Sequence, residues 1–230
     1  MFSTSQSRSL ATRIQRLNQA QLYVLTDGGW SADEFNQRIT QLVSAGVDIL
    51  QLRDKTLDDR NHLARARLLR SLTANTRTLF IVNDRADIAL LSEADGVHVG
   101  QDEMTVQDVR RVTGPDYLVG VSTHTIEQAH CAVAENANYI GCGPTYPSAT
   151  KQFASFPGTA FLREVAREVS LPAFAIGGIS AENLPDVLKT GCRRIAISSA
   201  VTRVDDAVAA VRGLREQLLG KDNNFTPRSS

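Results

Sequence analysis

Eight short apolar runs, each followed by an amphipathic stretch, constrain the fold of this chain more than any other feature. Most runs are apolar without alternation, so both faces of each expected strand should be covered. Strands that alternate with helices in this way form parallel sheets with crossover connections. The runs predict strands at 22–27, 48–54, 78–84, 95–100, 117–123, 139–144, 173–178 and 193–200.

Eight strand-helix units in about 200 residues fit an α/β fold of the closed, parallel (β/α)8 TIM barrel type. A doubly wound open sheet is the alternative, but no GxGxxG motif follows the first strand. We expect a single barrel domain at 21–219. Residues 1–20 form a helical or frayed lead-in in this interpretation, and 220–230 a disordered tail.

Charge and composition exclude several classes of protein. The 230 residues carry 25 Lys plus Arg and 25 Asp plus Glu, and this balance argues against a nucleic-acid partner bound through bulk charge. No apolar run approaches the roughly 18 residues of a membrane span. The N-terminus makes a poor secretory signal and only weakly resembles a transit peptide. Three cysteines without CxxC spacing, Cys131, Cys142 and Cys192, indicate reduced core thiols in a cytoplasmic protein.

Polar residues follow seven of the eight expected strands. In a TIM barrel the carboxyl ends of the strands meet at one rim, where active sites lie. These residues are therefore predicted to converge on one site. They are Gln51, Arg53 and Lys55; Asn83 and Asp84; Gly100, Gln101, Asp102 and Glu103; Ser122, Thr123 and His124; Ser148, Thr150 and Lys151; Gly177 and Gly178; and Ser198 and Ser199.

The charges at this rim suit a diphosphate. Arg53 offers bidentate contacts to phosphate, and Lys55 and Lys151 offer point charges. Mg²⁺ shared with a polyphosphate usually takes one or two protein carboxylates, which Asp84 and either Asp102 or Glu103 supply.

A second anion site is expected after the seventh and eighth strands, where this fold commonly binds phosphate. Gly177 and Gly178 allow close approach of the backbone to a ligand, and Ser198 and Ser199 precede a helical turn. Two sites on one rim predict two phosphorylated small-molecule substrates.

Each of these residues also has a structural interpretation. Asp84 could cap the next helix, and Asp102 or Glu103 the helix near Thr105. Arg53 could pair with Asp54 or Asp84. His98 and His124 are more often polar core residues than catalysts, the paired glycines could relieve packing, and 145–156 is either a lid or a surface loop.

Several stretches together make the chain resemble the thiamine phosphate synthase family, also called thiamin-phosphate pyrophosphorylase. They are LYVLTD, QLRDK, IVNDRADIAL, ADGVHVGQDE, GVSTHT, YIGCGPTYPSATK, IGGI and SSAV, in the family's order across 21–203. The resemblance implies a transferase of thiamine biosynthesis. Hydroxymethylpyrimidine diphosphate would react with a thiazole phosphate, or its carboxylated form, to give thiamine monophosphate and diphosphate.

The resemblance also implies roles for individual residues. The pyrimidine diphosphate would contact Gln51, Leu52, Arg53, Asp54, Lys55, Asn83, Ser122 and Lys151. Arg53, Lys55, Ser122 and Lys151 would act in catalysis. The thiazole phosphate would contact Ser148, Ala149, Thr150, Gly178, Ser198 and Ser199. Asp84 and Glu103 would hold Mg²⁺.

One position departs from the family pattern. Family members commonly have Asp where this chain has Glu103, and Asp102 precedes it, so Asp102 is the alternative second ligand. Two other functions remain open: a thiazole tautomerase relative, which needs no diphosphate site, and a catalytically silent phosphate-binding regulator. The sequence also leaves open whether the chain forms a homo-oligomer.

Overall fold

The computed structural model describes residues 9–26, 29–147 and 156–220. Eight parallel strands close into a barrel in the order β1 to β8, with β1 paired to β8. The prediction of a TIM barrel is confirmed, and the open-sheet alternative is excluded. The strands are β1 (Leu22–Leu25), β2 (Ile49–Leu52), β3 (Leu79–Asn83), β4 (Gly96–Val99), β5 (Leu118–Thr123), β6 (Tyr139–Cys142), β7 (Ala173–Ile176) and β8 (Ile195–Ile197).

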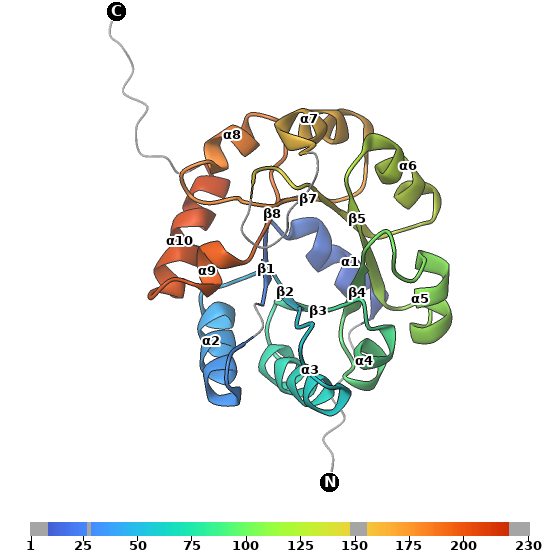
Figure 1. Cartoon of the computed structure of the whole chain (residues 1–230), viewed down its shortest axis with the longest axis vertical. Helices are drawn as coiled ribbons and strands as arrows, with labels where there is room; N and C mark the ends of the chain where they lie inside the picture. The colour runs from blue at the N-terminus through green and yellow to red at the C-terminus, as the bar shows by residue number, and fades with distance from the viewer. Residues whose placement is uncertain (1–8, 27–28, 148–155, 221–230) are drawn as a thin grey trace, which may run out of the picture.

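Helices follow the strands and form a ring around the barrel (Figure 1). The helices of the described residues are α1 (Leu10–Gln19), α2 (Ala32–Ser44), α3 (Asp59–Thr73), α4 (Ala86–Leu91), α5 (Val106–Thr113), α6 (Ile126–Ala134), α7 (Gly158–Glu168), α8 (Leu184–Leu188), α9 (Ser199–Thr202) and α10 (Ala207–Leu218). Ser31 caps α2 in a capping box with Glu34.

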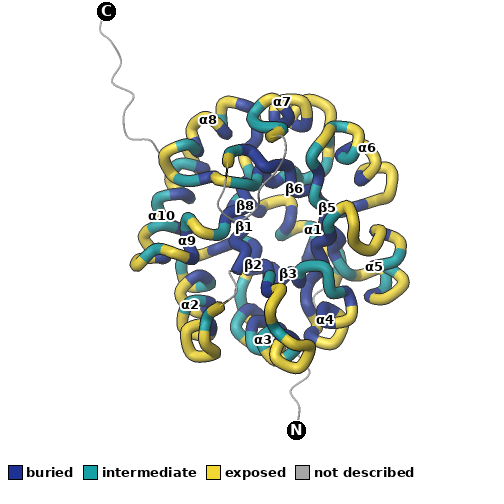
Figure 2. Tube along the Cα trace, in the orientation of Figure 1, coloured by how far each residue is buried: buried dark blue, intermediate teal, exposed yellow. Residues whose placement is uncertain are grey.

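The core has two layers because successive residues of a strand point to opposite faces. Val24, Leu50 and Val82 point outward into the layer between strands and helices. Tyr23, Ile49 and Leu79 point into the barrel. Figure 2 shows the strands buried at the centre and the exposed residues on the outer helices and loops. Burial of each large apolar side chain contributes about 1.5–3 kcal/mol.

Helix α1 lies within the ring of the other helices in Figure 1 and contributes to the core inside the barrel. Its Leu17 is buried with Ile49, Leu79 and Leu118, which lie near the amino ends of their strands. The helix therefore packs against the amino-terminal end of the barrel, opposite the predicted rim.

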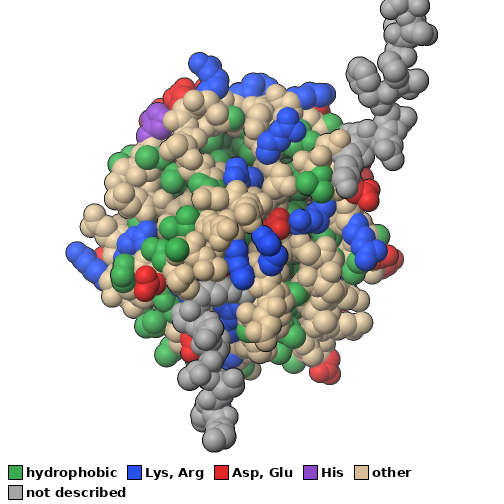
Figure 3. Space-filling model, turned by 180° about the vertical axis from the view of Figure 1, so that it is seen from behind, with side chains coloured by type: hydrophobic (Ala, Val, Ile, Leu, Met, Phe, Trp, Pro, Cys, Tyr) green, Lys and Arg blue, Asp and Glu red, His purple; other side chains and the backbone are tan. Residues whose placement is uncertain are grey.

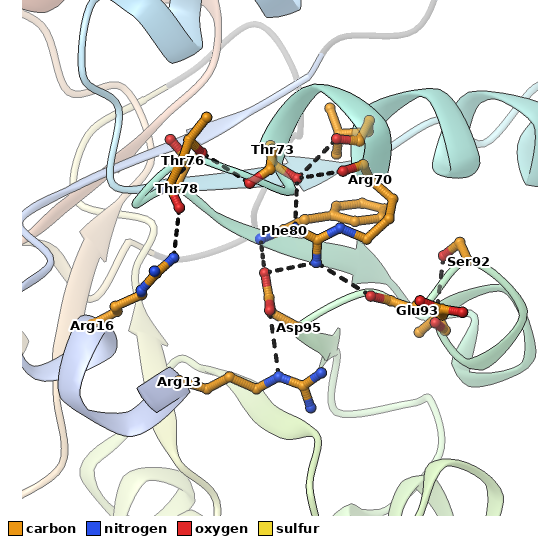
Figure 4. Close-up of polar contacts among 12 residues, drawn as sticks. Arg13, Arg16, Arg70, Thr73, Thr76, Thr78, Phe80, Ser92, Glu93 and Asp95 are labelled. Atoms are coloured by element: carbon orange, nitrogen blue, oxygen red, sulfur yellow. Dashed lines mark hydrogen bonds and ion pairs between the residues drawn. The ribbon is translucent and has the colours of Figure 1, made fainter. Parts of the chain in front are cut away.

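Arg13 of α1 is also buried at this end of the barrel. Its Nε lies 3.4 Å from Oδ1 of Asp95, and Arg70 of α3 approaches Oδ2 of the same carboxylate at 3.2 Å (Figure 4). The Phe80 N–H also donates to Asp95, at 2.9 Å. Charged groups thus attach α1 and α3 to the loop before β4.

The surface and the cysteines complete the description. On the face in Figure 3, acidic and basic side chains are interspersed. No helix in the described part of the chain is both long and apolar enough to cross a bilayer.

Cys142 and Cys192 are buried free thiols, but Cys131 is exposed on α6, so the expectation of three core thiols is wrong at that position. Helix periodicity turns this residue outward.

Candidate active site

A small pocket, partly open to solvent, lies inside the barrel. Tyr23, Leu25, Tyr139, Phe174 and Ile176 supply most of its apolar wall, and Gln51, His98 and Ser122 supply polar groups. A few polar groups set in an apolar wall are typical of small-molecule sites.

Four hydrogen bonds connect the polar groups of the pocket across the barrel. Gln51 Nε2 donates to the Tyr23 hydroxyl at 2.7 Å, and that hydroxyl lies 3.1 Å from the hydroxyl of Tyr139. The Tyr139 hydroxyl is 3.3 Å from His98 Nδ1, and His98 Nε2 is 3.0 Å from Ser122 Oγ. We call these five residues the interior chain. It joins side chains from β1, β2, β4, β5 and β6.

Burial keeps the interior chain uncharged. It lowers the pKa of His98 from its ordinary 6.5 to about 4, so the imidazole is neutral near pH 7. Burial also raises the pKa values of Tyr23 and Tyr139 well above 10. His98 is therefore a hydrogen-bonded interior residue, as the structural interpretation of its position expects.

The end of β3 carries Asp84, whose backbone conformation is strained. Asp84 has a φ of +61°, and Arg85 N–H donates across it to the Asn83 carbonyl at 2.7 Å, which closes a three-residue turn. Backbone strain of this kind costs about 1–3 kcal/mol and is concentrated at functional sites. Asp84 Oδ2 accepts from Asn83 Nδ2 at 2.6 Å and lies 3.6 Å from Lys55 Nζ.

Asp84 does not cap the next helix. The N-cap position of α4 is Arg85, and no side chain caps this helix through a hydrogen bond. The contacts of the carboxylate instead bring together Asn83, Asp84 and Lys55, three residues that the sequence assigns to one site. The structural alternative for Asp84 is thus excluded.

Neighbouring side chains at the end of β2 and just after it lie in different environments. Gln51 points into the pocket, whereas Leu52 is fully buried in the layer between strands and helices. The Arg53 guanidinium pairs with no carboxylate among the residues that the structure describes, so the expected pairing with Asp54 or Asp84 is not seen there. Its backbone N–H donates to Thr26 Oγ1 at 3.0 Å.

Asp54 stabilises the loop that carries Arg53 and Lys55. Its carboxylate accepts from the backbone and hydroxyl of Thr56 at 2.9 and 2.7 Å, and Arg65 of α3 lies 3.5 Å away. Burial alone would raise the pKa of Asp54, but the Thr56 hydrogen bonds and the Arg65 charge together lower it. Its contact with substrate stays a prediction.

The loop after β4 contains Gln101, Asp102 and Glu103, all exposed. Neither acidic residue caps α5, because the Thr105 side chain does so by accepting from Asp108 N–H. Glu103 Cγ lies 3.5 Å from where a Cβ on Gly100 would stand, so its side chain folds back toward the end of β4. The choice between Glu103 and Asp102 as the second metal ligand beside Asp84 stays a prediction.

His124 and Thr123 have contacts with neighbouring backbone. His124 Nδ1 lies 2.5 Å from the Gly143 carbonyl, and Thr123 Oγ1 donates to the Gly141 carbonyl at 3.0 Å. Both side chains thus connect the end of β5 to β6. Ser122, which precedes them, is the residue of this strand end that faces the pocket.

The two glycines after β7 are required by packing. Gly177 and Gly178 have φ values of +98° and +62°. A Cβ on Gly177 would lie 2.8 Å from Pro144, and one on Gly178 would lie 2.6 Å from the Pro147 carbonyl oxygen. Both glycines therefore allow the loops after β6 and β7 to touch, as the packing interpretation expects, and their phosphate role stays a prediction.

The remaining predicted residues lie after β6 and β8. Ser198 is at the N-cap position of α9 without a capping side-chain bond, and Ser199 is exposed. Ser148, Ala149, Thr150 and Lys151 lie outside the described residues, and so does most of the expected lid.

Sequence reasoning missed Tyr23 and Tyr139, and it placed Gln101 at the rim without a role. Gln101 donates to the Ser122 carbonyl at 2.6 Å and holds the end of β5. A signal for the tyrosine was present, because glycine inside a strand indicates close approach of another group. A Cβ on Gly120 would overlap the Tyr139 ring, and one on Gly141 would lie 3.4 Å from the His98 ring.

Comparisons with known proteins agree with this geometry. A family model described as thiamine monophosphate synthase matches residues 22–201. A thiamine-phosphate synthase of Rhodopirellula baltica is 46% identical over 226 residues, which cover 96% of this chain and 60% of that protein. One from Mycobacterium sp. (strain KMS) is 40% identical over 215 residues, 89% of this chain and 95% of that protein.

A solved structure gives the same result. The thiamine phosphate pyrophosphorylase of Pyrococcus furiosus superposes with a TM-score of 0.81 at 32% identity, over 89% of this chain and 98% of that one. The family model covers most of the barrel, and the sequence relatives cover nearly all of the chain. The chain therefore belongs to the thiamine monophosphate synthase family, as its sequence motifs predict.

Proposed function

We propose that this protein is a thiamine phosphate synthase. It joins 4-amino-2-methyl-5-hydroxymethylpyrimidine diphosphate to 4-methyl-5-(2-phosphoethyl)thiazole, or its carboxylated form, and releases thiamine monophosphate and diphosphate. Family membership supports the reaction, and the rim geometry supports the assignment of residues. A cytoplasmic location and a homo-oligomer stay predictions from the sequence.

The pyrimidine ring is assigned to the mouth of the interior pocket. Gln51 Oε1 is buried there and has no hydrogen-bond partner among the described residues. A buried acceptor without a partner costs about 1–3 kcal/mol, and the exocyclic amino group of the pyrimidine would satisfy it. The apolar wall from Leu25 and Ile176 suits the faces of the ring.

The diphosphate lies at the rim above the pocket. Lys55 is 56% exposed at its side chain and lies beside Asp84, which places its charge at the mouth of the barrel. Arg53, whose guanidinium pairs with no described carboxylate, and Lys151 complete the predicted set of cations. Arg and Lys together give bidentate and point-charge contacts to the diphosphate oxygens.

Asp84 and Glu103 are the residues that would hold Mg²⁺. The Asp84 carboxylate is partly exposed and already accepts a cationic neighbour, Lys55, and the Glu103 side chain folds toward the same rim. Two carboxylates are a usual protein contribution to a Mg²⁺ site shared with phosphate. Bound there, the ion would neutralise charge on the diphosphate.

The reaction needs no protein nucleophile. The bond between the pyrimidine methylene carbon and the diphosphate oxygen breaks, and its electron pair leaves with the diphosphate. The electron-rich aminopyrimidine stabilises the resulting cation, and the lone pair of the thiazole nitrogen forms the new C–N bond. Arg53 and Lys55 stabilise the charge that develops on the leaving group, which is the main contribution of such preorganised groups.

The thiazole phosphate is assigned to the loops after β6, β7 and β8. Ser198 and Ser199 lie at the start of α9, and the Ser198 hydroxyl does not cap that helix. Gly178 lies against the loop after β6. Ser148, Ala149 and Thr150 complete this predicted subsite.

The observation that carries the proposal is the meeting of Lys55, Asn83 and Asp84 at the rim above a pocket lined by Gln51 and Ser122. The test is to incubate the protein with both substrates, with and without Mg²⁺, and to measure thiamine monophosphate and diphosphate. We expect both products in equal amounts, only with Mg²⁺.

Two other outcomes would contradict the proposal. Isomerisation of the thiazole without release of diphosphate would identify the tautomerase alternative. Binding of the phosphate esters in calorimetry, with no turnover under any condition, would identify a regulator.

A further inference from the structure

The hydrogen bonds of the interior chain can all donate in the same direction, from Gln51 toward Ser122. The Gln51 end sets that direction. The Gln51 amide nitrogen can only donate, so the Tyr23 oxygen accepts from it at 2.7 Å. The Tyr23 hydrogen is then available for Tyr139, and the Tyr139 hydrogen for His98 Nδ1. Each hydroxyl accepts one hydrogen bond and donates the next.

The direction determines where the proton of His98 lies. A neutral imidazole has one protonated nitrogen, and Nδ1 accepts from Tyr139, so the proton is on Nε2. Nε2–H donates to Ser122 Oγ, 3.0 Å away. The Ser122 hydrogen then has no acceptor among the residues that the structure describes, and it lies at the wall of the pocket.

The opposite direction is less favourable. It would place the Gln51 carbonyl against Tyr23 and leave the amide nitrogen, with two N–H groups, at the buried position that now lacks a partner. Unsatisfied buried N–H groups are rarer than under-satisfied carbonyl oxygens, because a carbonyl loses less when one lone pair stays unused. The inferred direction places the Gln51 carbonyl oxygen, and not an amide nitrogen, at that position.

We propose that Gln51, through Tyr23 and Tyr139, fixes His98 in its Nε2–H tautomer, and that His98 thereby orients Ser122 as a hydrogen-bond donor to the substrate. His98 is a positioning residue in this scheme, since it acts through Ser122. The substrate part rests on the proposed function, whereas the tautomer is a property of the free protein.

The packing around the chain leaves its members little freedom. The His98 and Tyr139 rings lie 5.5 Å apart between centroids, and the absence of side chains on Gly120 and Gly141 makes room for them. Gln101 holds the Ser122 backbone through its carbonyl. The pocket therefore presents an acceptor from Gln51 and a donor from Ser122, which together match a ring that has an amino group and an unprotonated nitrogen.

The first test measures the tautomer by NMR. Protein labelled with ¹⁵N-histidine, without substrate, is studied near pH 7.5, and the His98 ring signals are assigned by their loss in His98→Gln. We expect a protonated Nε2 and an unprotonated Nδ1. A protonated Nδ1, or an average of the two forms, would overturn the proposal whether or not the protein makes thiamine monophosphate.

The origin of the direction is tested by removing the donor. Gln51→Met should convert the His98 signals to a mixture of tautomers, although residue 51 does not touch His98. Leu25→Met, which alters the same pocket but no member of the chain, is the matched control and should leave the Nε2–H form. A pure Nε2–H tautomer in Gln51→Met would show that Gln51 does not set the direction.

The positioning role is tested with two variants of His98. The amide nitrogen of Gln can reach the position of Nε2 and donate to Ser122, whereas Asn places its amide near Nδ1. We expect His98→Asn to lower kcat/KM about tenfold, the value of one net hydrogen bond, and His98→Gln to restore most of it. Equal losses in two variants of equal thermal stability would contradict the role.

A double variant separates action through Ser122 from an independent effect. Because His98 acts through that hydroxyl, Ser122→Ala combined with His98→Asn should be no slower than Ser122→Ala alone. Losses that multiply would show that the two residues act independently, and would overturn the positioning role.

Discussion

Both ends of the barrel place an aspartate against basic side chains, but the two arrangements differ in what completes them. At the amino-terminal end, Asp95 is 0% exposed and lies between Arg13 and Arg70 (Figure 4). At the rim, Asp84 is 21% exposed, and Lys55 beside it is 56% exposed. The first set of charges is enclosed by protein, whereas the second remains open to a ligand.

The pattern of contacts made by Asp95 is repeated around the amino-terminal end. Asp48, Asp95 and Asn138 each precede an even-numbered strand, and each accepts a backbone N–H from the strand before it. Each also contacts an arginine from a helix: Arg215, Arg70 and Arg110 respectively. These groups fix strand and helix ends, so polar residues at this end stabilise the fold.

The largest effect is expected from the enclosed end. Asp95→Asn keeps an acceptor for Phe80 N–H but removes the Asp95 charge from the buried Arg13 and the mostly buried Arg70. Breaking a buried ion pair on one side typically costs about 3–5 kcal/mol in the free energy of unfolding. Urea denaturation followed by circular dichroism measures this loss.

Asp186→Asn is the matched control, because Asp186 forms an exposed pair with Lys189. We expect a change within about 0.5 kcal/mol for this variant. A loss below about 1 kcal/mol in Asp95→Asn would show that the amino-terminal charges are no more important to stability than surface pairs.

At the rim, the same kind of change should affect turnover instead. Lys55→Met removes a charge that would stabilise the leaving diphosphate, and loss of one such group typically lowers turnover about 10²–10³-fold. Its free energy of unfolding should change by no more than about 1 kcal/mol, since the pair with Asp84 is exposed. Steady-state release of diphosphate measures the effect.

Lys189→Met, a lysine variant on α8 outside the site, should keep parental turnover. If Lys55→Met also retains its turnover at saturating substrate, Lys55 is not a catalytic contact. The charges at the rim would then not differ in function from those at the amino-terminal end.

The sequence predicted the barrel and the meeting of Lys55, Asn83 and Asp84 because both depend on local patterns. Continuous apolar runs such as the one around Leu50 define buried strands, and residues that directly follow them reach the rim in any closed parallel barrel. Asn83, Asp84 and Lys55 were brought to one site by this rule alone. Polar residues that follow strands can be assigned to the rim from the sequence without knowing how the side chains pack.

The rest could not be predicted, because it depends on distant partners. The position of α1 depends on a fit between Leu17 and three strands that its own periodicity does not encode. The interior chain joins Tyr23, His98 and Tyr139 from separate strands, and no spacing links them. The tight turn at Asp84 likewise requires coordinates, since an Asp after a strand is an equally good helix cap in the sequence.

Acid should destabilise the fold through His98, which is buried inside the barrel. His98 has a pKa of about 4 when folded and an ordinary value of 6.5, so from pH 6.5 down to 4 the unfolded chain binds a proton that the folded protein does not. The free energy of unfolding therefore falls with decreasing pH, by about 3 kcal/mol from this group. Urea titrations at several pH values measure it.

His98→Gln provides the comparison for the acid effect. Every other group titrates in both proteins, so the difference in unfolding free energy between parent and variant should narrow or reverse between pH 6.5 and 4. A difference that does not change with pH would show that the interior of the barrel accepts the imidazolium, and that burial does not keep His98 neutral.

The smallest effect on stability separates strain from function at Asp84. Asp84→Gly removes the carboxylate but relieves a φ of +61°, which glycine adopts without steric cost. The strain released offsets the lost contacts with Lys55 and Asn83, so the free energy of unfolding should change by less than about 1 kcal/mol. Release of diphosphate should nevertheless be lost, because the predicted metal ligand is gone.

Asp84→Ala, which loses the same carboxylate but keeps the strain, should be less stable than Asp84→Gly. If the alanine variant proves as stable as the glycine variant, the turn stores no strain, and the rim resembles the amino-terminal end in being built for stability.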